Sequence, residues 1–576
     1  MKKVPMLFFV SLVFGTPNYS EAVALVRNGE PVSVIVTADR PSASVSEGAE
    51  DLQNWLRKSS GAIVPIKAES AIGKESTEGI ILVGDTQRTR SLGINPDKFG
   101  LEEIVIQTFP QTLVIIGDDE RPDGYPLKGT VLAVSAFADQ ILGIRLLWPG
   151  DLGEIVPRQS TIEIETVDIR EKPVLVERSL RNLLYNKAIH SKIDALGWDH
   201  DQFRSMDGRA DEWFRFHRIG GSFHGRYGHA FGDYWERFHE EHPDWFALQP
   251  DGTRDNSQPE HARYSSHRLC ISNPGLIERA ARDAIKKLKA DPTLDCASVS
   301  PNDGGPQTFC LCKKCESWDA PEGKTIYMDS KEGRIPHVSL TDRFVRFYSE
   351  VAKIVAEEMP DRYIGAYAYH HYTEAPIHAR LHPNVIIGFV PETKMYMNEA
   401  EREEVRENWL KWSEKAEHLF VRPNYLSGMH ALPTVIVHRL AEDFRFYQDH
   451  KNLHTDLDCS YEHWATNGLN YYVAAKLLWN PYRDVDEIVE EYCVVGFGPA
   501  AKSIHRYFEE IERITNEIAV ERRSPDSDTV ARYYNDEILG GLNKILDEAE
   551  RAAASDKIVP RRIAFLRQGL EYAPIC

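Results

Sequence analysis

The sequence Ser272-Asn-Pro-Gly-Leu-Ile-Glu-Arg-Ala-Ala-Arg-Asp-Ala-Ile-Lys-Lys-Leu288, followed by Cys296-Ala-Ser-Val-Ser300, decides the fold class. Ser272-Asn-Pro274 is a typical helix start, because it offers a capping side chain and a proline near the first turn. Apolar residues then recur on one helical face: Ile277, Ala281, Ala284, Ile285 and Leu288. The run Cys296–Ser300 predicts a short buried strand. Such strand-and-helix blocks are what a parallel sheet with crossover helices requires.

Further blocks of this kind occupy the middle of the chain. A striped helix ends near Val355, and the strand Tyr363–Tyr369 follows it. The predicted strands are Val174–Arg181, the Ile219 region, Leu269–Ile271, Cys296–Ser300, Tyr363–Tyr369, Val385–Val390, Leu419–Val421 and about Thr455–Tyr461. A count of about eight predicts a (β/α)8 TIM-type barrel.

The composition changes along the chain and predicts three domains. All 21 histidines lie between His190 and His505, so a boundary is expected before His190. We expect a small N-terminal α/β domain over residues 23–172, because short apolar strands alternate there with helix-like stretches. The barrel is expected over residues 173–485. Apolar residues at helical spacing after Gly498-Pro499 predict a helical C-terminal region over residues 486–576.

The first 22 residues read as a secretory signal peptide. Lys2 and Lys3 precede an apolar run, and small and polar residues follow it. We therefore expect a secreted or periplasmic bacterial protein. No other run is long enough to span a membrane. The formal charge of −20 disfavours a nucleic-acid partner, whose phosphates would be repelled.

Polar residues gather where the predicted strands end. In a barrel the loops after the strands form the open, catalytic face. Asp303 follows the strand at Cys296–Ser300 directly; the alternative is an ordinary turn residue that bonds its own backbone. Aromatic rings beside amides, carboxylates and histidines suit a carbohydrate. The predicted substrate-binding residues are Arg181, His224, Asn302, Tyr369, His370, Tyr372 and Trp464.

Several of these residues also have purely structural explanations. Tyr369, Tyr372 and Trp464 could equally pack in the core. Arg181 could clamp an anionic group or could form a salt bridge to the neighbouring strand. His370 and His371 would point in opposite directions if they lay on a strand, so that both could not readily line one pocket.

A pair of carboxylates could hydrolyse a glycosidic bond. Asp303 is the predicted general acid, and Glu462 is the predicted base or nucleophile. Glu392 is the main rival to Glu462 for the second role. No cofactor is expected for this chemistry.

Five of the eight cysteines lie between residues 270 and 315, and four of these form a candidate cluster. The spacing Cys310-x-Cys312-x-x-Cys315, with Cys270 as a fourth ligand, suits a structural zinc site, whereas an oxidising compartment favours disulfides. Both alternatives stay open, ahead of free thiols. In either case we expect the cluster to fix the long loop that follows Asp303.

Several segments carry a resemblance to known families. Leu142-Gly-Ile-Arg-Leu-Leu-Trp-Pro-Gly150 and its surroundings resemble the α/β domain that precedes the barrel in β-N-acetylhexosaminidases and α-glucuronidases. The segments His242–Phe246, Leu269–Pro274, Ser298–Asp303 with the cysteines, and Asn470–Trp479 are similar to a poorly characterised family of secreted bacterial proteins. Over residues 30–510, this resemblance implies a glycosidase-like (β/α)8 barrel with a helical extension.

One departure from the better-known relatives affects the mechanism. Hexosaminidases carry adjacent Asp and Glu where this chain has Asn302-Asp303-Gly304, and α-glucuronidases use a Glu acid. The resemblance therefore supports the fold more than the reaction.

The sequence predicts a secreted glycoside hydrolase acting on a polysaccharide or glycan. The alternative is a non-catalytic carbohydrate-binding or cell-surface protein on a degenerate barrel. A metal-dependent hydrolase is a third hypothesis, which no HExxH-type spacing supports. The sequence gives no indication of the oligomeric state.

Overall fold

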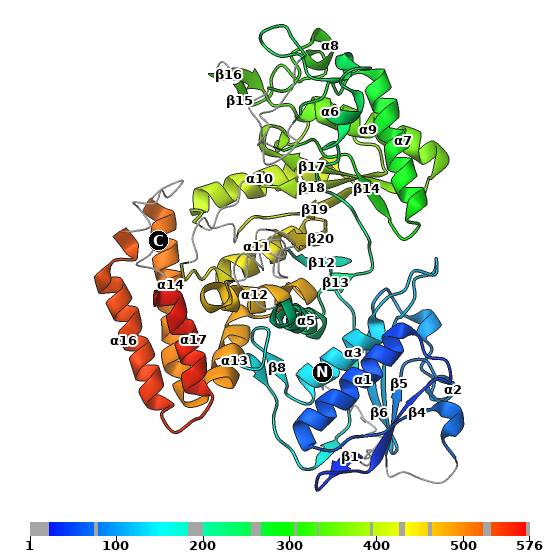
Figure 1. The fold of residues 1–576 in the computed structure, drawn as a ribbon, viewed down its shortest axis with the longest axis vertical. Helices are drawn as coiled ribbons and strands as arrows, with labels where there is room; N and C mark the ends of the chain where they lie inside the picture. Colours follow the sequence, from blue (N-terminus) through cyan, green and yellow to red (C-terminus); the bar gives the residue numbers. More distant parts are fainter. Residues whose placement is uncertain are drawn as a thin grey trace, which may run out of the picture.

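The computed structural model describes residues 22–73, 79–181, 200–254, 267–303, 308–330, 333–391, 396–425, 432–458, 463–521 and 532–571. Figure 1 shows the N-terminal part in blue, the central part in green to yellow, and the C-terminal helices in orange and red. The Glu392 and Glu462 positions lie outside the described residues. None of the helices within these ranges has the length and apolar character needed to cross a membrane.

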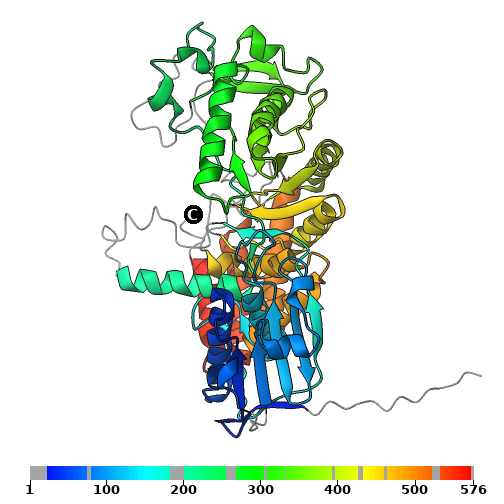
Figure 2. The ribbon, with the colours of Figure 1, turned by 90° about the vertical axis from the view of Figure 1, so that its right-hand side faces the viewer.

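A six-stranded sheet with helices against it forms the N-terminal part. Its strand order is β11-β6-β7-β5-β3-β4, and β10-β1-β2 form a smaller sheet beside it. The strands are β1 Val23–Arg27, β2 Glu30–Pro31, β3 Ser33–Thr37, β4 Ile66–Ala68, β5 Gly79–Val83, β6 Ile104–Phe109, β7 Thr112–Gly117, β8 Arg145–Leu146, β9 Glu154–Ile155, β10 Ile162–Ile164 and β11 Asp168–Glu171. The helices are α1 Ala43–Ser60, α2 Gln87–Ser91 and α3 Gly129–Gln140. Figure 2 shows α1 on one side of this sheet.

The central part is built on a curled seven-stranded sheet. Its order is β13-β12-β20-β19-β18-β17-β14, and the pairs from β12 round to β14 are parallel. The strands are β12 Glu177–Leu180, β13 Gly220–Gly221, β14 Cys296–Ser298, β17 Tyr363–Tyr369, β18 Val385–Val390, β19 His418–Val421 and β20 Asn452–Leu457. After β13 the chain runs beside β14 and the residues that follow it. Two isolated parallel bridges, Gly225 to Cys296 and His229 to Ser300, join these segments, so the two edges of the sheet approach each other.

The expected eighth strand, Leu269–Ile271, does not join this sheet. Leu269 forms an isolated antiparallel bridge with Phe246, and the Cys270 amide donates to the Trp245 carbonyl. The backbone groups of this segment are therefore engaged outside the curled sheet. A mixed α/β fold is confirmed, but the described residues form a seven-stranded curled sheet where eight barrel strands were expected.

Helices follow most of the strands, as a parallel sheet requires. They are α5 His200–Phe216, α6 Tyr234–Phe238, α7 Pro274–Ala290, α8 Lys313–Glu316, α9 Thr341–Glu358, α10 Glu399–Lys415, α11 Val437–Asp449 and α12 Trp464–Trp479. Asn273 caps α7 by accepting from the Gly275 and Leu276 amides, as the sequence predicts. The crossover from β17 to β18 has only the short helix η4 (His370–Tyr372), and a hairpin of β15 (Thr325–Ser330) and β16 (Gly333–Val338) precedes α9.

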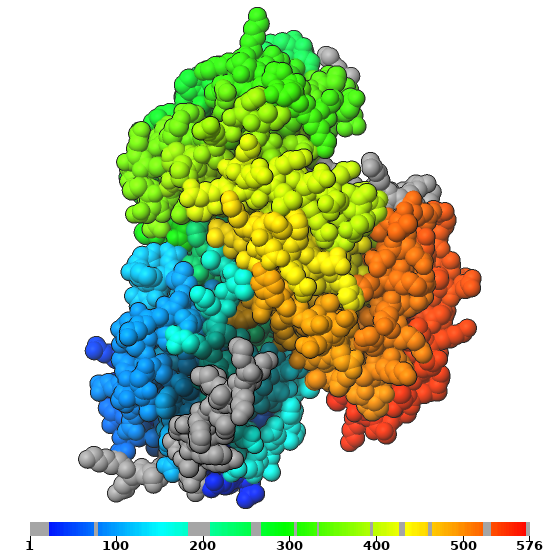
Figure 3. All heavy atoms as spheres, turned by 180° about the vertical axis from the view of Figure 1, so that it is seen from behind, coloured from blue at the N-terminus to red at the C-terminus, as the bar shows by residue number. Residues whose placement is uncertain are grey.

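The C-terminal part is helical, in agreement with the sequence. Its helices are α13 Val485–Phe497, α14 Ala501–Glu521, α16 Asp536–Ala552 and α17 Val559–Glu571. The yellow-to-orange middle of the chain lies between the green part and these helices (Figure 3). From Asn467 to Trp479, helix α12 is buried on every side.

Buried ion pairs connect the N-terminal part to the centre. Lys476 of α12 lies 2.8 and 2.9 Å from the two carboxylate oxygens of Asp139 in α3. Arg178 of β12 donates two bonds, of 2.8 and 2.9 Å, to Glu102. One apolar core runs through α1, α3, α12 and the C-terminal helices.

Candidate active site

Asp303 lies just beyond the carboxyl end of β14. Ser300 bridges to His229 on one side, and its Oγ accepts from the Tyr367 amide of β17 at 3.1 Å on the other. The chain therefore leaves the sheet immediately after Ser300. The Asp303 side chain is 48% exposed, so it remains open to a ligand.

His229 faces the Asp303 carboxylate. Its Nε2 lies 3.9 Å from Asp303 Oδ2, and its Nδ1 bonds to the Pro301 carbonyl. Because a carbonyl can only accept, Nδ1 carries the hydrogen, and in a neutral ring Nε2 presents a lone pair. His229 can therefore accept a proton or a hydrogen bond on the Asp303 side.

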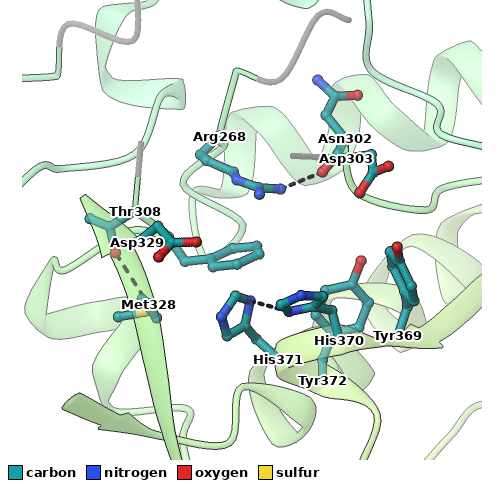
Figure 4. Close-up of a pocket in the computed structure, with 11 residues that line it drawn as sticks. Arg268, Asn302, Asp303, Thr308, Met328, Asp329, Tyr369, His370, His371 and Tyr372 are labelled. Atoms are coloured by element: carbon teal, nitrogen blue, oxygen red, sulfur yellow. Dashed lines mark hydrogen bonds between the residues drawn. The ribbon is translucent and has the colours of Figure 1, made fainter. Parts of the chain in front are cut away.

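A pocket opens on the other side of Asp303 (Figure 4). Its volume is about 210 Å³, smaller than the usual range of about 300 to 1,000 Å³ for drug-sized ligands, and it suits one small polar unit. The residues that line it are Arg268, Asn302, Asp303, Thr308, Phe309, Met328, Asp329, Tyr369, His370, His371 and Tyr372. Tyr369 and Asp303 lie together at one end of the pocket, and Asp329 lies at the other (Figure 4).

The two adjacent histidines both line this pocket, which corrects the expectation that they point apart. They lie in the short helix η4 and not on the strand, and their Nδ1 atoms are 3.1 Å apart. His370 has a positive φ of 49°, so the backbone turns sharply after Tyr369. His371 Nε2 bonds to the Tyr327 carbonyl at 2.9 Å, and burial lowers its pKa.

Burial also tunes the other pocket groups. It lowers the pKa of Arg268 and raises the pKa of Tyr372, which is 3% exposed. Arg268 lies over the Phe309 ring at 4.2 Å and donates to the Asn302 carbonyl. The pocket thus combines a cation, aromatic faces and carboxylates.

Asn302 holds the loops of the pocket in place. Its Oδ1 accepts from the Phe231 amide at 3.2 Å, and its Nδ2 donates to the Phe231 and His267 carbonyls at 3.0 and 3.1 Å. The side chain is buried, so its contribution to the pocket wall is mainly structural.

Two arginine–aspartate pairs flank Tyr367 at the same edge of the sheet. Arg181 at the end of β12 makes a bidentate pair with Asp456 of β20, and Arg422 pairs with Asp458. Arg181 Nη2 lies 3.5 Å from the Tyr367 hydroxyl, and the Arg422 guanidinium lies 5.1 Å from the Tyr367 ring centre. Arg181 was expected either to clamp an anionic group or to form a salt bridge to the neighbouring strand. The structure shows the salt bridge.

Asp456, Asp458, Arg422 and Tyr367 are not among the residues predicted from the sequence. A signal for the two aspartates was present, since His454 and Asp456 alternate along β20 and Asp458 continues this spacing just after its end. His229 and Tyr367 have ring centres 6.3 Å apart, so the pairs are continuous with the Asp303 site.

Beneath these pairs, His454 is fully buried inside the curled sheet, and the side chain of Glu177 beside it is 22% exposed. Glu177 Oε2 lies 3.7 Å from His454 Nε2, and neither atom has a hydrogen-bond partner among the described residues. Burial, reinforced by the nearby Asp456 charge, raises the pKa of Glu177 to about 8. Burial lowers the pKa of His454 to about 3. Both side chains are therefore mainly neutral at pH 7.

Besides Arg181, two further predicted binding residues lie outside the pocket lining. The His224 amide donates to Asp295 at 2.8 Å, and its ring contacts Thr293, so it sits at the amino end of β14, opposite Asp303. Trp464 packs edge-on against Trp213 and Tyr471, each with ring centres 5.0 Å away. Trp464 therefore packs among core aromatic rings, which was the structural alternative to a role in substrate binding.

Glu392 and Glu462, the candidates for the second acid, follow β18 and β20 in the sequence. Glu392 follows Pro391 after β18, and Glu462 comes four residues after Asp458. Both neighbours lie at the carboxyl edge that carries Asp303. The positions of the two glutamates themselves lie outside the described residues.

The four clustered cysteines meet at one point, as predicted. The sulfur atoms of Cys270, Cys310, Cys312 and Cys315 all lie within 4.8 Å of one another, and none of the four forms a disulfide. Among the described residues this is the single group of three or more His, Cys, Asp or Glu side chains close enough to share a metal ion.

Solved structures similar to this chain include glycoside hydrolases, one of which shares the overall fold. A family GH115 4-O-methyl-α-glucuronidase with specificity for decorated arabinogalactans matches with a TM-score of 0.59 at 13% identity, over 96% of this chain and 72% of that one. A GH138 enzyme targeting pectin rhamnogalacturonan II matches with a TM-score of 0.47 at 10% identity, over 94% and 85%. The N-acetyl-β-hexosaminidase of Streptomyces plicatus matches with a TM-score of 0.42 at 12% identity, over 86% and 93%.

The fold is therefore glycosidase-like. Residues 148–510 match the family described as Domain of unknown function (DUF4838), and the chain belongs to that family. No curated protein sequence matches the chain.

Proposed function

We propose that the protein is an exported glycoside hydrolase that cleaves a polysaccharide or glycan by a two-carboxylate mechanism. The observation that carries the proposal is the position of Asp303, a half-exposed carboxylate at the carboxyl edge of the curled sheet, on the wall of a pocket lined by tyrosines and histidines. Active sites of related barrel folds occupy this edge. The glycosidase-like fold is consistent with the proposal.

Asp303 is the proposed general acid. It would donate its proton to the glycosidic oxygen while the bond to the anomeric carbon breaks. His229, with its Nε2 lone pair directed at the carboxyl group, would hold that proton in place before transfer. Tyr369 and Tyr372 offer aromatic faces to the sugar ring, and His370 offers a polar group.

Glu462 is the proposed partner, which would activate water or attack the anomeric carbon. Glu392 is the rival, and both residues follow strands that end at the edge carrying Asp303. Asp456 and Asp458 are less suited to the role, since each already forms an ion pair with an arginine. A carboxyl separation of about 5 to 5.5 Å would give retention, and about 6.5 to 9.5 Å would give inversion.

The proposed domain layout is an export signal over residues 1–22, an α/β domain over 23–172, a catalytic region over 173–485 and a helical region over 486–576. The β11 strand ends at Glu171 and β12 begins at Glu177, which supports the first internal boundary. Helix α13 begins at Val485, which supports the second.

The test is a screen of the full-length protein against aryl glycosides and glycan oligomers, with binding measured by calorimetry in parallel. Wild-type turnover should fall by at least about 10²-fold in Asp303→Asn and in Glu462→Gln, while the affinity for substrate changes little. A loss in Glu392→Gln with normal turnover in Glu462→Gln would transfer the second role to Glu392. Binding without turnover in the wild-type protein would favour the non-catalytic alternative.

A further inference from the structure

The four clustered thiols come from two segments that are distant in the sequence. Cys270 lies after the Phe246–Leu269 bridge. Cys310 and Cys312 precede the short helix α8, which contains Cys315. Three of the four are buried, and Cys312 is partly exposed. Cys270 Sγ lies 3.7 Å from Cys312 Sγ and 3.9 Å from Cys315 Sγ.

These separations are those of thiolates around one metal ion. Four sulfurs that each lie about 2.3 Å from a central zinc are about 3.8 Å from one another in a regular tetrahedron. A disulfide would instead require two sulfurs about 2.05 Å apart. In addition, all four sulfurs are mutually close, whereas two disulfides would need only pairwise proximity.

The groups around the sulfurs are hydrogen-bond donors. The Leu248 amide donates to Cys310 Sγ at 3.3 Å, and the Cys315 amide donates to Cys312 Sγ at 3.4 Å. The Ser272 hydroxyl lies 3.1 Å from Cys315 Sγ, and the Arg254 guanidinium bonds to Cys270. Donors and a cation stabilise the net negative charge of a metal held by four thiolates.

We propose that Cys270, Cys310, Cys312 and Cys315 bind one zinc ion as four thiolates. A closed four-cysteine set leaves no open position for water or substrate, so the ion is structural. Thr308 and Phe309, which line the pocket beside Asp303, directly precede Cys310. The zinc thereby fixes one wall of the pocket to the segment that carries Arg268.

A second buried contact supports the same segment from the other side. The Arg343 guanidinium donates to the Cys310 carbonyl at 2.8 Å and pairs with Asp319, which follows α8. The Leu311 amide donates to the Leu248 carbonyl at 3.0 Å. The backbone between the cysteines is therefore held in the shape that brings the sulfurs together.

Metal analysis of the purified full-length protein tests the proposal without any activity measurement. We expect about one zinc per chain, lost in Cys312→Ser and in Cys310→Ser and retained in Cys493→Ala, which removes a buried thiol of α13 outside the cluster. Replacement by Co²⁺ should give the intense absorption of a tetrahedral thiolate site. A strong chelator should lower the melting temperature of the wild-type protein and not that of Cys312→Ser.

A cysteine variant could lose zinc simply because it does not fold. Intact-mass and thiol measurements avoid this problem, because they need only the wild-type protein. With zinc bound, all four thiols should react with a thiol reagent after denaturation in chelator. Protein without metal whose mass is lower by two hydrogens for each disulfide formed would overturn the proposal. Metal-free protein with four reduced thiols and an unchanged melting temperature in Cys312→Ser would overturn it as well.

Discussion

Asp303 and His229 face each other across the open edge of the curled sheet, with Nε2 of the histidine 3.9 Å from Oδ2 of the aspartate. The two residues lie on adjacent segments, because His229 bridges to Ser300 just before the chain reaches Asp303. The bond from His229 Nδ1 to the Pro301 carbonyl fixes which nitrogen is directed at the carboxylate. At this edge of the sheet, beside the pocket, the pair is well placed to move a proton.

If Asp303 is the general acid, its loss should matter most for substrates with poor leaving groups. Protonation assists a basic leaving oxygen and adds little for a phenol that leaves readily as an anion. Asp303→Asn should therefore lower kcat/KM by about 10²- to 10⁴-fold on glycan oligomers and much less on a dinitrophenyl glycoside. The measurement is kcat/KM across a leaving-group series.

The matched control is Asp361→Asn, an exposed aspartate at the opposite end of β17. This variant should retain wild-type rates on every substrate. If Asp303→Asn lost the same factor on all leaving groups, the acid role would be wrong. Since the Asp303 side chain is half exposed, its variant should fold normally, and circular dichroism checks this.

The sequence predicted the edge position of Asp303 because local patterns suffice for it. Alternating or continuous apolar runs mark the strands, and a polar residue directly after a strand must lie at its carboxyl end. β17 and β18 were predicted at their observed bounds for the same reason. Capping by Asn273 is likewise a local signal.

Local sequence patterns could not predict the arginine–aspartate pairs, because these pairs form between strands that are far apart in the sequence. Arg181 meets Asp456 because β12 lies beside β20, and this pairing joins residues 275 positions apart. The misplacement of His224 has a similar origin, since β13 has two residues and the chain continues along β14 after it. The histidines of η4 were misread because a positive φ at His370 converts the strand end into a turn.

The Arg181–Asp456 pair should contribute asymmetrically to stability. The Asp456 side chain is 3% exposed, whereas that of Arg181 is 34% exposed. Arg181→Met leaves a buried, unpaired carboxylate and should cost about 3 to 5 kcal/mol of unfolding free energy. Asp456→Asn leaves a cation that can reach water and should cost clearly less. Urea unfolding at pH 7 measures both.

A surface pair provides the control for this comparison. Arg27 and Glu163 are 47% and 45% exposed, so Arg27→Met should change stability by at most about 1 kcal/mol. Equal losses in Arg181→Met and Asp456→Asn would show that exposure does not govern the cost of breaking the pair at the sheet edge.

Glu177 should make the protein less stable as pH rises from weakly acidic to weakly alkaline. Its pKa is raised from 4.5 to about 8 in the folded state, so above pH 4.5 the unfolded chain gives up a proton that the folded chain keeps. The unfolding free energy should therefore fall between pH 4.5 and 8, by about 2 to 5 kcal/mol, and level off above pH 8. Urea unfolding across this range measures the slope.

Glu177→Gln removes the titrating group and retains a neutral side chain of similar shape. The variant should lose this slope and gain stability relative to wild type at pH 8, while Glu163→Gln on the surface should keep the slope. On the acid side, the lowered pKa of His454 predicts a loss of stability as pH falls from 6.5 to about 3, which His454→Gln should reduce. A wild-type slope retained in Glu177→Gln would assign the effect to another group.

Lys476 and Asp139 should couple the N-terminal part to the centre. Their side chains are 4% and 9% exposed, and one continuous apolar core surrounds them. Lys476→Met leaves Asp139 with Arg145 at 3.1 Å as its remaining partner, so the expected loss of unfolding free energy is about 2 to 4 kcal/mol.

Because an apolar pair can replace a buried ion pair, the double variant Lys476→Met, Asp139→Leu should be more stable than Lys476→Met alone. A double-mutant cycle by urea unfolding measures this coupling, and the shared core predicts a single transition for residues 23–172 and the rest of the chain. Two separate transitions, or strictly additive losses, would mean that the two parts fold independently of this contact.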